Sequence, residues 1–417
     1  MAGPLTPRSL KITAPIIVVD WQTILRDAAV IVHDGKVARV GLADAMKHEK
    51  VDRTIRLPHH ILHPGFINCH CHLELSYMAG ELTPRAPFTD WISELIALRT
   101  QTKAPHIRAC ITTALRRLTH TGTTCVGDVC QTGLPAAALA KSGLRGVIFH
   151  EVIGLDPALA PARFNELLRR ISEAKKHGGL LTHGVAPHAA YSTSAELISL
   201  AAKYAANVGA PMSMHMLETR EETQFCEKGT GPFKNLLEKL GQYSPGFIPR
   251  QSPMTLAADA GALKNGLMVH FNHSSPGDIA SLKKYRASVA FCPNSNRWFG
   301  RSPRHPVAKL IRNKINVGLG TDSLASNTDL DMRAEMRAFI KSFPALGPQT
   351  AFYLATQGSA MALGLGKMAG TLLPGALFDA AALEIKISSK ADPLRSIIIS
   401  KGNYSRLWVN GRPVSIR

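Results

Sequence analysis

Short apolar stretches alternate with amphipathic segments through the middle of the chain. The apolar stretches predicted as strands are residues 61–68, 123–129, 146–151, 180–186, 211–216, 266–271, 288–292 and 316–320. Apolar residues recur at helical spacing between them, as in residues 161–176, 194–208, 277–284 and 331–343. This alternation is typical of a parallel sheet with helical crossovers. Eight such units over about 300 residues predict an α/β fold, a (β/α)8 TIM-type barrel with its active site at the C-terminal strand ends. A doubly wound open sheet is the alternative, but the Gly-rich phosphate fingerprint that it often carries is absent after the first strand.

Both ends of the chain have a different, β-rich pattern. Residues 16–19, 28–32 and 37–40 at one end, and 380–387, 396–400 and 407–409 at the other, read as short strands. The turns His33-Asp34-Gly35-Lys36 and Asn410-Gly411 suit hairpins. The termini of a domain often lie close together. We therefore expect residues 1–62 and 366–417 to form one small β-sandwich domain beside a catalytic barrel of residues 63–365.

Composition narrows the class of protein. The chain has 417 residues, 45% of them hydrophobic, which is ordinary for a soluble globular protein. No apolar run approaches the roughly 20 residues that span a membrane, and no signal-peptide core follows the N-terminus, so we expect a cytoplasmic protein. Seven scattered cysteines argue against a disulfide framework. Cys69 and Cys71 are expected to be small buried residues rather than ligands.

The formal net charge of +19 raises the question of nucleic-acid binding. The Lys and Arg residues are spread along the chain, without a basic run or a nucleic-acid-binding motif. The pattern favours a generally basic surface that would help to attract an anionic substrate. An inactive metal-binding scaffold or a nucleic-acid-binding protein stays as the non-enzyme alternative.

Polar residues suited to metal chemistry follow several predicted strands. His70 and His72 come directly after the first strand, and residues two apart on a strand point to the same side. His215 ends the fifth strand, with Glu218 three residues later; His270 ends the sixth, and Asp322 follows the eighth. Singly, Asp322 would also suit a helix cap and Glu218 the first turn of a helix. In a barrel, however, all of them converge on one mouth, which predicts a metal site.

The chain resembles the amidohydrolase superfamily, in its aminohydrolase and chlorohydrolase branch. The matching segments are residues 64–72, 215–219, 269–270, 320–323, 325–327 and 370–375. The resemblance implies that His70, His72, His215 and Asp322 hold one divalent metal ion, zinc or iron. It implies that Glu218 and His270 are the acid/base pair, assisted by Asp322. Residues 185–188 contain no lysine where two-metal relatives carry a bridging carbamate, so a mononuclear site is favoured.

These groups predict hydrolytic deamination. Three imidazoles and a carboxylate leave a coordination position for water, whose pKa the metal lowers towards neutrality. Attack by the metal-bound hydroxide, with Glu218 protonating a ring nitrogen and then the leaving amine, releases ammonia. The branch therefore implies an enzyme acting on C–N bonds other than peptide bonds in cyclic amidines, with a small-molecule substrate and, as is common in relatives, a homo-oligomeric assembly.

Substrate recognition is carried by other side chains. His188 and Trp91 match positions that contact substrate in relatives, and Arg145 is a further candidate. Residues 72–76, 88–91, 228–233, 252–253 and 292–297 are similar to aminodeoxyfutalosine deaminases of menaquinone synthesis, which places Ser295 and Asn296 near substrate. The sequence departs from commoner forms at Cys69, Cys71 and residues 271–273. Alternatives are S-adenosylhomocysteine or methylthioadenosine, guanine, or cytosine deamination, and s-triazine dechlorination.

Overall fold

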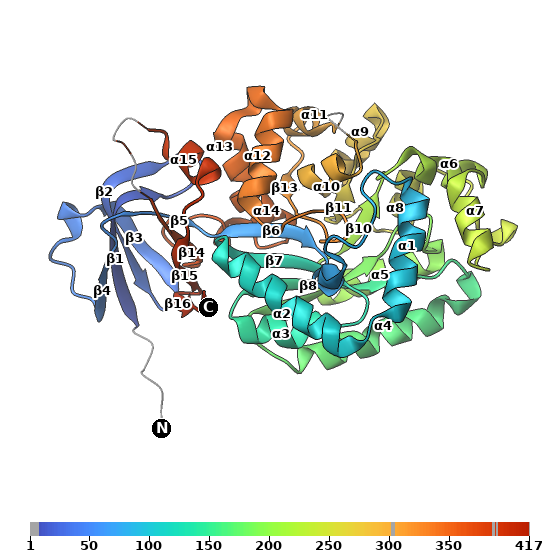
Figure 1. Ribbon diagram of the computed structural model, residues 1–417, viewed down its shortest axis with the longest axis horizontal. Helices are drawn as coiled ribbons and strands as arrows, with labels where there is room; N and C mark the ends of the chain where they lie inside the picture. The colour runs from blue at the N-terminus through green and yellow to red at the C-terminus, as the bar shows by residue number, and fades with distance from the viewer. Residues whose placement is uncertain (1–7, 302–304, 386–387, 389–390, 417) are drawn as a thin grey trace.

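The computed structural model describes residues 8–301, 305–385, 388 and 391–416 of the chain. Figure 1 shows two units: a β-sheet at one end, which contains strands from both ends of the chain, and a larger body of alternating strands and helices. None of the helices in these described ranges is long and apolar enough to span a membrane.

The larger body is a (β/α)8 barrel. Its strands are β6 (Phe66–Cys71), β7 (Thr123–Cys130), β8 (Arg145–Val152), β9 (Leu181–Pro187), β10 (Ser213–Met216), β11 (Leu267–His270), β12 (Ser288–Phe291) and β13 (Val317–Leu319). They pair in parallel within two four-stranded sheets, β6 to β9 and β10 to β13. Parallel bridges between Val185 and Met212, and between Cys71 and Asp322, join the two sheets. Most strand positions are buried, which explains their nearly continuous apolar sequences.

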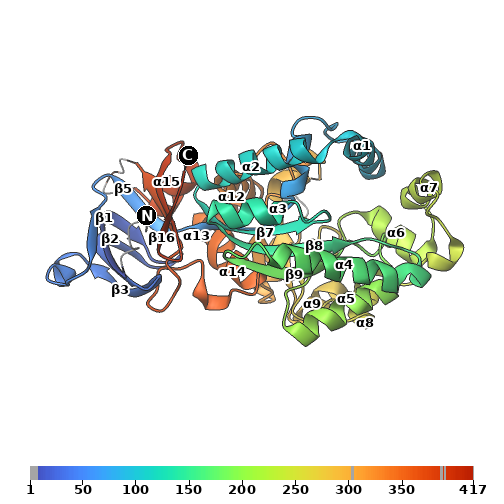
Figure 2. The ribbon, with the colours of Figure 1, turned by 90° about the horizontal axis from the view of Figure 1, so that it is seen from below.

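Helices surround these strands and connect them. They are α1 (Phe88–Gln101), α2 (Ala104–His120), α3 (Pro135–Ser142), α4 (Ala160–Lys175), α5 (Ala195–Val208), α6 (Arg220–Lys228), α7 (Pro232–Lys239), α8 (Pro253–Asp259), α9 (Pro276–Tyr285), α10 (Pro293–Trp298), α11 (Val307–Arg312), α12 (Met332–Ser342), α13 (Gly347–Tyr353) and α14 (Ser359–Ala362). The helices predicted over residues 161–176, 194–208, 277–284 and 331–343 are α4, α5, α9 and α12. Figure 2 shows α1 and α7 at the end of the molecule remote from the terminal sheet.

The terminal sheet combines strands from both ends of the chain. Its strands are β1 (Ser9–Val18), β2 (Ile24–His33), β3 (Lys36–Leu42), β4 (Arg53–Arg56), β5 (His60–Pro64), β14 (Ala380–Glu384), β15 (Tyr404–Val409) and β16 (Arg412–Val414). The order is β16-β15-β14-β5-β1-β2-β3, with β4 paired to β1. The two hairpin turns touch, since a Cβ on Gly35 would lie 2.6 Å from the Asn410 carbonyl oxygen. The sheet also has a hydrophobic core of its own, which includes Ile12, Val30, Phe378 and Trp408.

Three predicted strands differ in the structure. Residues 61–68 form two strands, because β5 ends at Pro64 in the terminal sheet and β6 begins at Phe66 in the barrel. The strand predicted over residues 380–387 is β14 as far as Glu384, and Lys386 and Ile387 lie outside the described residues. Residues 396–400 are not a strand: they lie at the end of helix α15 (Pro393–Ile399), which packs against α12 and α13.

Candidate active site

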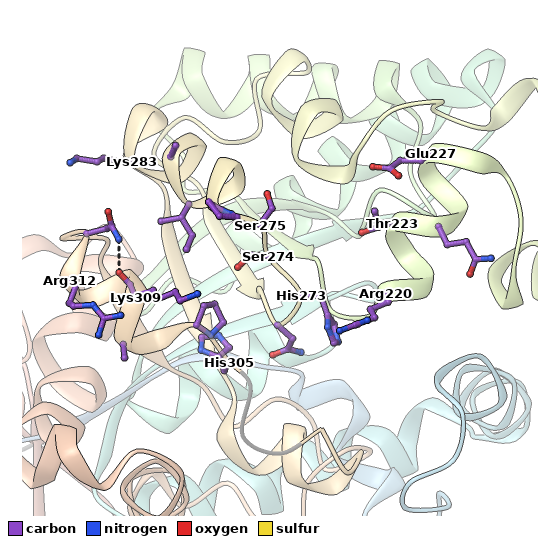
Figure 3. Close-up of a pocket in the computed structure, with 18 of the residues that line it drawn as sticks. Arg220, Thr223, Glu227, His273, Ser274, Ser275, Lys283, His305, Lys309 and Arg312 are labelled. Atoms are coloured by element: carbon purple, nitrogen blue, oxygen red, sulfur yellow. Dashed lines mark hydrogen bonds between the residues drawn. The ribbon is translucent and has the colours of Figure 1, made fainter.

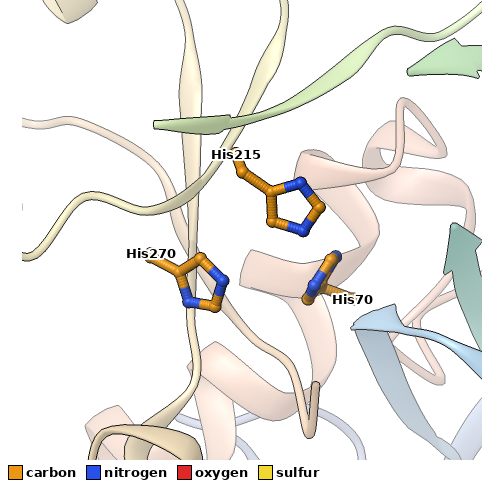
Figure 4. A group of neighbouring side chains, drawn as sticks. All are labelled: His70, His215 and His270. Carbon is orange, nitrogen blue, oxygen red and sulfur yellow. The ribbon is translucent and has the colours of Figure 1, made fainter. Parts of the chain in front are cut away.

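The ends of the barrel strands bring the predicted ligands together. His70 lies in β6 and His72 directly after it, His215 lies in β10, and Asp322 follows β13. His70 Nε2 is 3.5 Å and His72 Nε2 is 3.7 Å from Asp322 Oδ1. The ring of His215 lies 5.2 Å from that of His70 and 5.4 Å from that of His72, measured between centroids. Figure 4 shows the rings of His70, His215 and His270 gathered around one point.

This cluster fits a divalent cation. Both ring nitrogens of His70 are buried and have no hydrogen-bond partner among the described residues. His215 Nδ1 lies 3.1 Å from the carbonyl oxygen of His188, which leaves its Nε2 available as a ligand. Burial lowers the pKa of His72 to about 3 and that of His215 well below its usual value, so both rings are neutral, as ligands must be. Imidazole and carboxylate are donors that suit zinc and iron alike.

Two hydroxyl groups orient Asp322. Ser295 Oγ and Ser326 Oγ each donate to Asp322 Oδ2 at 2.7 Å, so Oδ1 is the oxygen that faces His70 and His72. Burial raises the pKa of the Asp322 carboxyl, but its contact with His70 and the neighbouring rings of His270 and His72 outweigh burial and hold its pKa well below the usual range. Asp322 therefore presents an ionised oxygen to the cluster.

Glu218 and His270 lie beside the cluster. His270 Nε2 is 3.6 Å from Glu218 Oε2, and burial lowers the pKa of His270. Arg301 donates a 2.8 Å hydrogen bond to Glu218 Oε1. The Arg301 guanidinium is itself held over the rings of Phe299 and Phe88, at 4.2 Å and 4.9 Å. Glu218 thus has one oxygen fixed by Arg301 and the other near His270.

A pocket of about 210 Å³ opens onto these groups. Trp91 and His188, both predicted to contact substrate, line it. Trp91 stacks on Phe88 at 5.5 Å and donates from Nε1 to the carbonyl oxygen of Ala325. The remaining aromatic lining comes from Tyr191 and Phe233, and the polar lining away from the ligands comes from Glu74, Arg99 and Glu151. The pocket therefore pairs a flat aromatic wall with the acid/base groups.

Three predicted substrate-binding residues do not line this pocket. Ser295 is fully buried and acts on Asp322. Asn296 donates to Asn272, which in turn donates to the carbonyl oxygen of Glu218, so Asn296 supports Glu218 from behind. Their contact with substrate stays a prediction, and the structure gives both side chains partners within the site.

Arg145 is the third. It is the first residue of β8, at the opposite end of that strand from Glu151, and its guanidinium pairs with Asp379 at 2.8 Å and 3.2 Å. Asp379 directly precedes β14 of the terminal sheet. That Arg145 binds substrate stays a prediction; in the structure this side chain joins the barrel to the terminal sheet.

A larger cavity of about 1270 Å³ lies elsewhere, between α6, α9 and α11 (Figure 3). Its cationic lining includes Arg220, Lys283, Lys309 and Arg312. His305 forms part of its wall, and His305 Nε2 lies 2.8 Å from the carbonyl oxygen of His270. The larger cavity therefore adjoins the candidate active site, but none of the predicted metal ligands lines it. The larger volume of this cavity therefore does not identify it as the active site.

Glu151 and Arg301 were not among the residues predicted from sequence. Glu151 is the penultimate residue of β8, so the strand-end reasoning that found His215 would also have found it. Arg301 follows α10 in a stretch without a periodic pattern, and only its contacts with Glu218 and two aromatic rings reveal it.

Comparison with known proteins places this site in a family. Residues 61–414 match the amidohydrolase family. The chain belongs to the amidohydrolase family. The match covers the whole barrel and the C-terminal strands β14, β15 and β16.

Relatives within the family share most of their length with this chain. The aminodeoxyfutalosine deaminase of Nitratiruptor sp. is 28% identical over 338 residues, which cover 80% of this chain and 81% of the relative. A 5-methylthioadenosine/S-adenosylhomocysteine deaminase of Desulforamulus reducens is 30% identical over 378 residues, 87% of this chain and 82% of the relative. A zinc-bound adenosine deaminase from Xanthomonas campestris has a TM-score of 0.80 at 25% identity, covering 97% of this chain and 92% of that one. The protein is a hydrolase that acts on C–N bonds in cyclic amidines.

Proposed function

We propose that this amidohydrolase removes the amino group of an adenine-type nucleoside by hydrolysis. The observation that carries the proposal is the position of Glu218, which faces the pocket beside both the ligand cluster and an aromatic wall. A carboxyl group so placed suits protonation of a ring nitrogen next to an amine-bearing carbon. The relatives named above are deaminases of nucleosides, which supports the same substrate class.

His70, His72, His215 and Asp322 would hold one divalent ion, zinc or iron. When bound, the metal supplies an activated water molecule for attack on the amine-bearing carbon. Asp322 Oδ1 and His270 Nε2 are placed to take a proton from that water, since both face the cluster. Glu218 would carry one proton of the water to the ring nitrogen and the other, taken up first by His270 or Asp322, to the departing amine. Arg301 fixes the Glu218 carboxyl for both transfers.

The pocket residues divide the work of recognition. Trp91 and Phe88 offer a stacked aromatic surface for a planar base. His188 lines the same pocket, with Nδ1 2.6 Å from Ser192 Oγ, and this contact fixes the orientation of its ring.

The first substrate to test is 6-amino-6-deoxyfutalosine, which would give the enzyme a role in menaquinone synthesis. Similarity to the Nitratiruptor enzyme favours it. The second candidate is 5-methylthioadenosine or S-adenosylhomocysteine, favoured by the relative at 30% identity. We further propose that the enzyme is cytoplasmic and homo-oligomeric.

An ammonia-release screen tests the proposal. Purified protein loaded with zinc or iron is offered aminodeoxyfutalosine, methylthioadenosine, S-adenosylhomocysteine, adenosine, guanine and cytosine. We expect release from an adenine nucleoside. The Glu218→Gln variant should bind metal like the wild type but release no ammonia, whereas Glu227→Gln on α6 should behave as the wild type. Metal-loaded wild type that is inactive on every adenine nucleoside would contradict the proposal.

A further inference from the structure

Glu151 places a carboxylate in the pocket wall without a protein partner. Its side chain lies in the pocket lining, and the residue is only 6% exposed. Oε1 is buried, and neither carboxylate oxygen accepts a hydrogen bond from the part of the chain that the structure describes. Leaving a buried acceptor unpaired costs roughly 1–3 kcal/mol. A buried polar group of this kind in a pocket wall is placed to form a hydrogen bond with a bound ligand.

Its acidic neighbour Glu74 is in the opposite situation. Glu74 accepts hydrogen bonds from the backbone N–H groups of Gln131 and Thr132, from the Thr132 hydroxyl and from Arg99. These donors occupy both of its oxygens. Of the two carboxylates in this part of the pocket, Glu151 is therefore the one available to a ligand.

His188 completes the recognition surface. Ligating atoms of Glu151, His188 and His215 lie within 4.8 Å of one another. His215 belongs to the predicted metal ligands, while His188 engages Ser192 through Nδ1. The other His188 nitrogen, Nε2, has no hydrogen bond from any residue in the described ranges. One wall of the pocket thus brings the Glu151 carboxyl group close to the His188 ring, and Nε2 of that ring has no hydrogen-bond partner among the described residues.

We propose that Glu151 is a specificity-determining residue that, together with His188, hydrogen-bonds the two vicinal hydroxyl groups of a ribose. The inference rests on the proposed nucleoside deaminase function and assigns its sugar recognition. Two adjacent hydroxyls match two adjacent unpaired groups, because each hydroxyl can both donate and accept.

The test compares sugars at constant base. The best adenine nucleoside from the ammonia screen is assayed beside its 2′-deoxy and 3′-deoxy analogues. Wild type should prefer the ribonucleoside in kcat/KM by about tenfold to hundredfold, because a deoxy analogue leaves a buried polar group of the pocket without its hydrogen-bond partner. Glu151→Leu should lower kcat/KM for the ribonucleoside to the level of the deoxy analogues and change the latter little. Glu196→Gln, on the exposed face of α5, is the matched control for Glu151→Gln.

Each outcome bears on a separate claim. Equal kcat/KM for the three sugars in the wild type, or a preference that survives in Glu151→Leu, overturns the role of Glu151 and leaves the deaminase proposal standing. A wild type that deaminates no adenine nucleoside overturns both. If the leucine variant does not fold, Glu151→Gln decides: calorimetric binding of inosine and 2′-deoxyinosine should differ less in that variant than in the wild type.

Discussion

Asp322 shows how a single side chain acquires its orientation at the end of a barrel strand. Its backbone has a φ of 59°, which is unusual for a residue other than glycine, and two serine hydroxyls hold Oδ2. The remaining oxygen is thereby directed at His70 and His72. Partners of this kind orient a ligand and raise the affinity of the site for its metal.

Removing either hydroxyl should weaken metal binding. Ser295→Ala or Ser326→Ala leaves Asp322 Oδ2 with one donor fewer in a buried setting. We expect the affinity for zinc to fall by about 10–100-fold in each variant, measured by competition with a chromophoric chelator. Ser172→Ala, on an exposed turn of α4, should bind zinc like the wild type. If Ser295→Ala and Ser326→Ala both bind zinc with wild-type affinity, these two hydroxyls do not affect Asp322 as a metal ligand.

The sequence places residues together in space where position along a strand decides it. His70, His72, His215 and Asp322 lie at or just after the ends of barrel strands, and parallel strands in a barrel bring their C-terminal ends to one mouth. The sequence does not indicate the contact of Ser295 with Asp322, which depends on how α10 packs. It does not indicate Arg301 either, because no local pattern indicates which carboxylate a long side chain will reach.

At the scale of elements, α15 is the instructive case. The run Ile397-Ile398-Ile399 is β-branched, which predicts a strand. Asp392-Pro393 is nevertheless a helix start: the Asp392 side chain accepts from Leu394 N at 2.9 Å, and Pro393 occupies the first turn. Leu394, Ile397 and Ile398 then share the buried face. In α15, capping and tertiary packing outweigh the β propensity of the isoleucines. In the barrel strands, β propensity and tertiary packing favour the same structure.

The cap of α15 should be measurable in the stability of the protein. Asp392→Ala removes the acceptor of Leu394 N, and we expect it to lower the free energy of unfolding by about 1 kcal/mol. Asp392→Asn keeps a capping oxygen and should cost only a few tenths of that. Urea denaturation followed by circular dichroism distinguishes the two. Equal losses in both variants would mean that the charge, and not the cap, stabilises the helix.

At the scale of the whole molecule, His63 lies where the terminal sheet meets the barrel. It belongs to β5 and packs on Phe66, Phe352 and Tyr404, with Nε2 2.9 Å from the Tyr404 hydroxyl. Burial lowers the pKa of His63 to about 4. The neutral ring is therefore part of the contact between the two units.

Acid should loosen this contact. In the unfolded chain His63 takes up a proton near pH 6.5, but in the folded chain only near pH 4. The stabilisation of the folded state by neutral His63 is therefore complete above pH 6.5 and is lost as the pH falls towards 4. The size of the loss is about 3 kcal/mol. In His63→Gln, the free energy of unfolding should fall less steeply between those pH values than in the wild type. His48→Gln, at an exposed position, should keep the wild-type slope, and an unchanged slope in His63→Gln would contradict the assignment.

Arg145 allows a test of the contact between the two units and of its predicted role in substrate binding. Its guanidinium is largely covered and pairs with Asp379, which is itself 3% exposed and also accepts from Asn410 N. Arg145→Met would leave that carboxylate buried and short of a partner, so we expect a loss of about 3 kcal/mol in the free energy of unfolding. Arg163→Met breaks an exposed pair with Glu166 and should cost less than about 1 kcal/mol. Because Arg145 lies outside the pocket, kcat and KM of the folded Arg145→Met enzyme should match the wild type at a temperature where both are folded. A raised KM with unchanged stability would instead support a role of Arg145 in substrate binding.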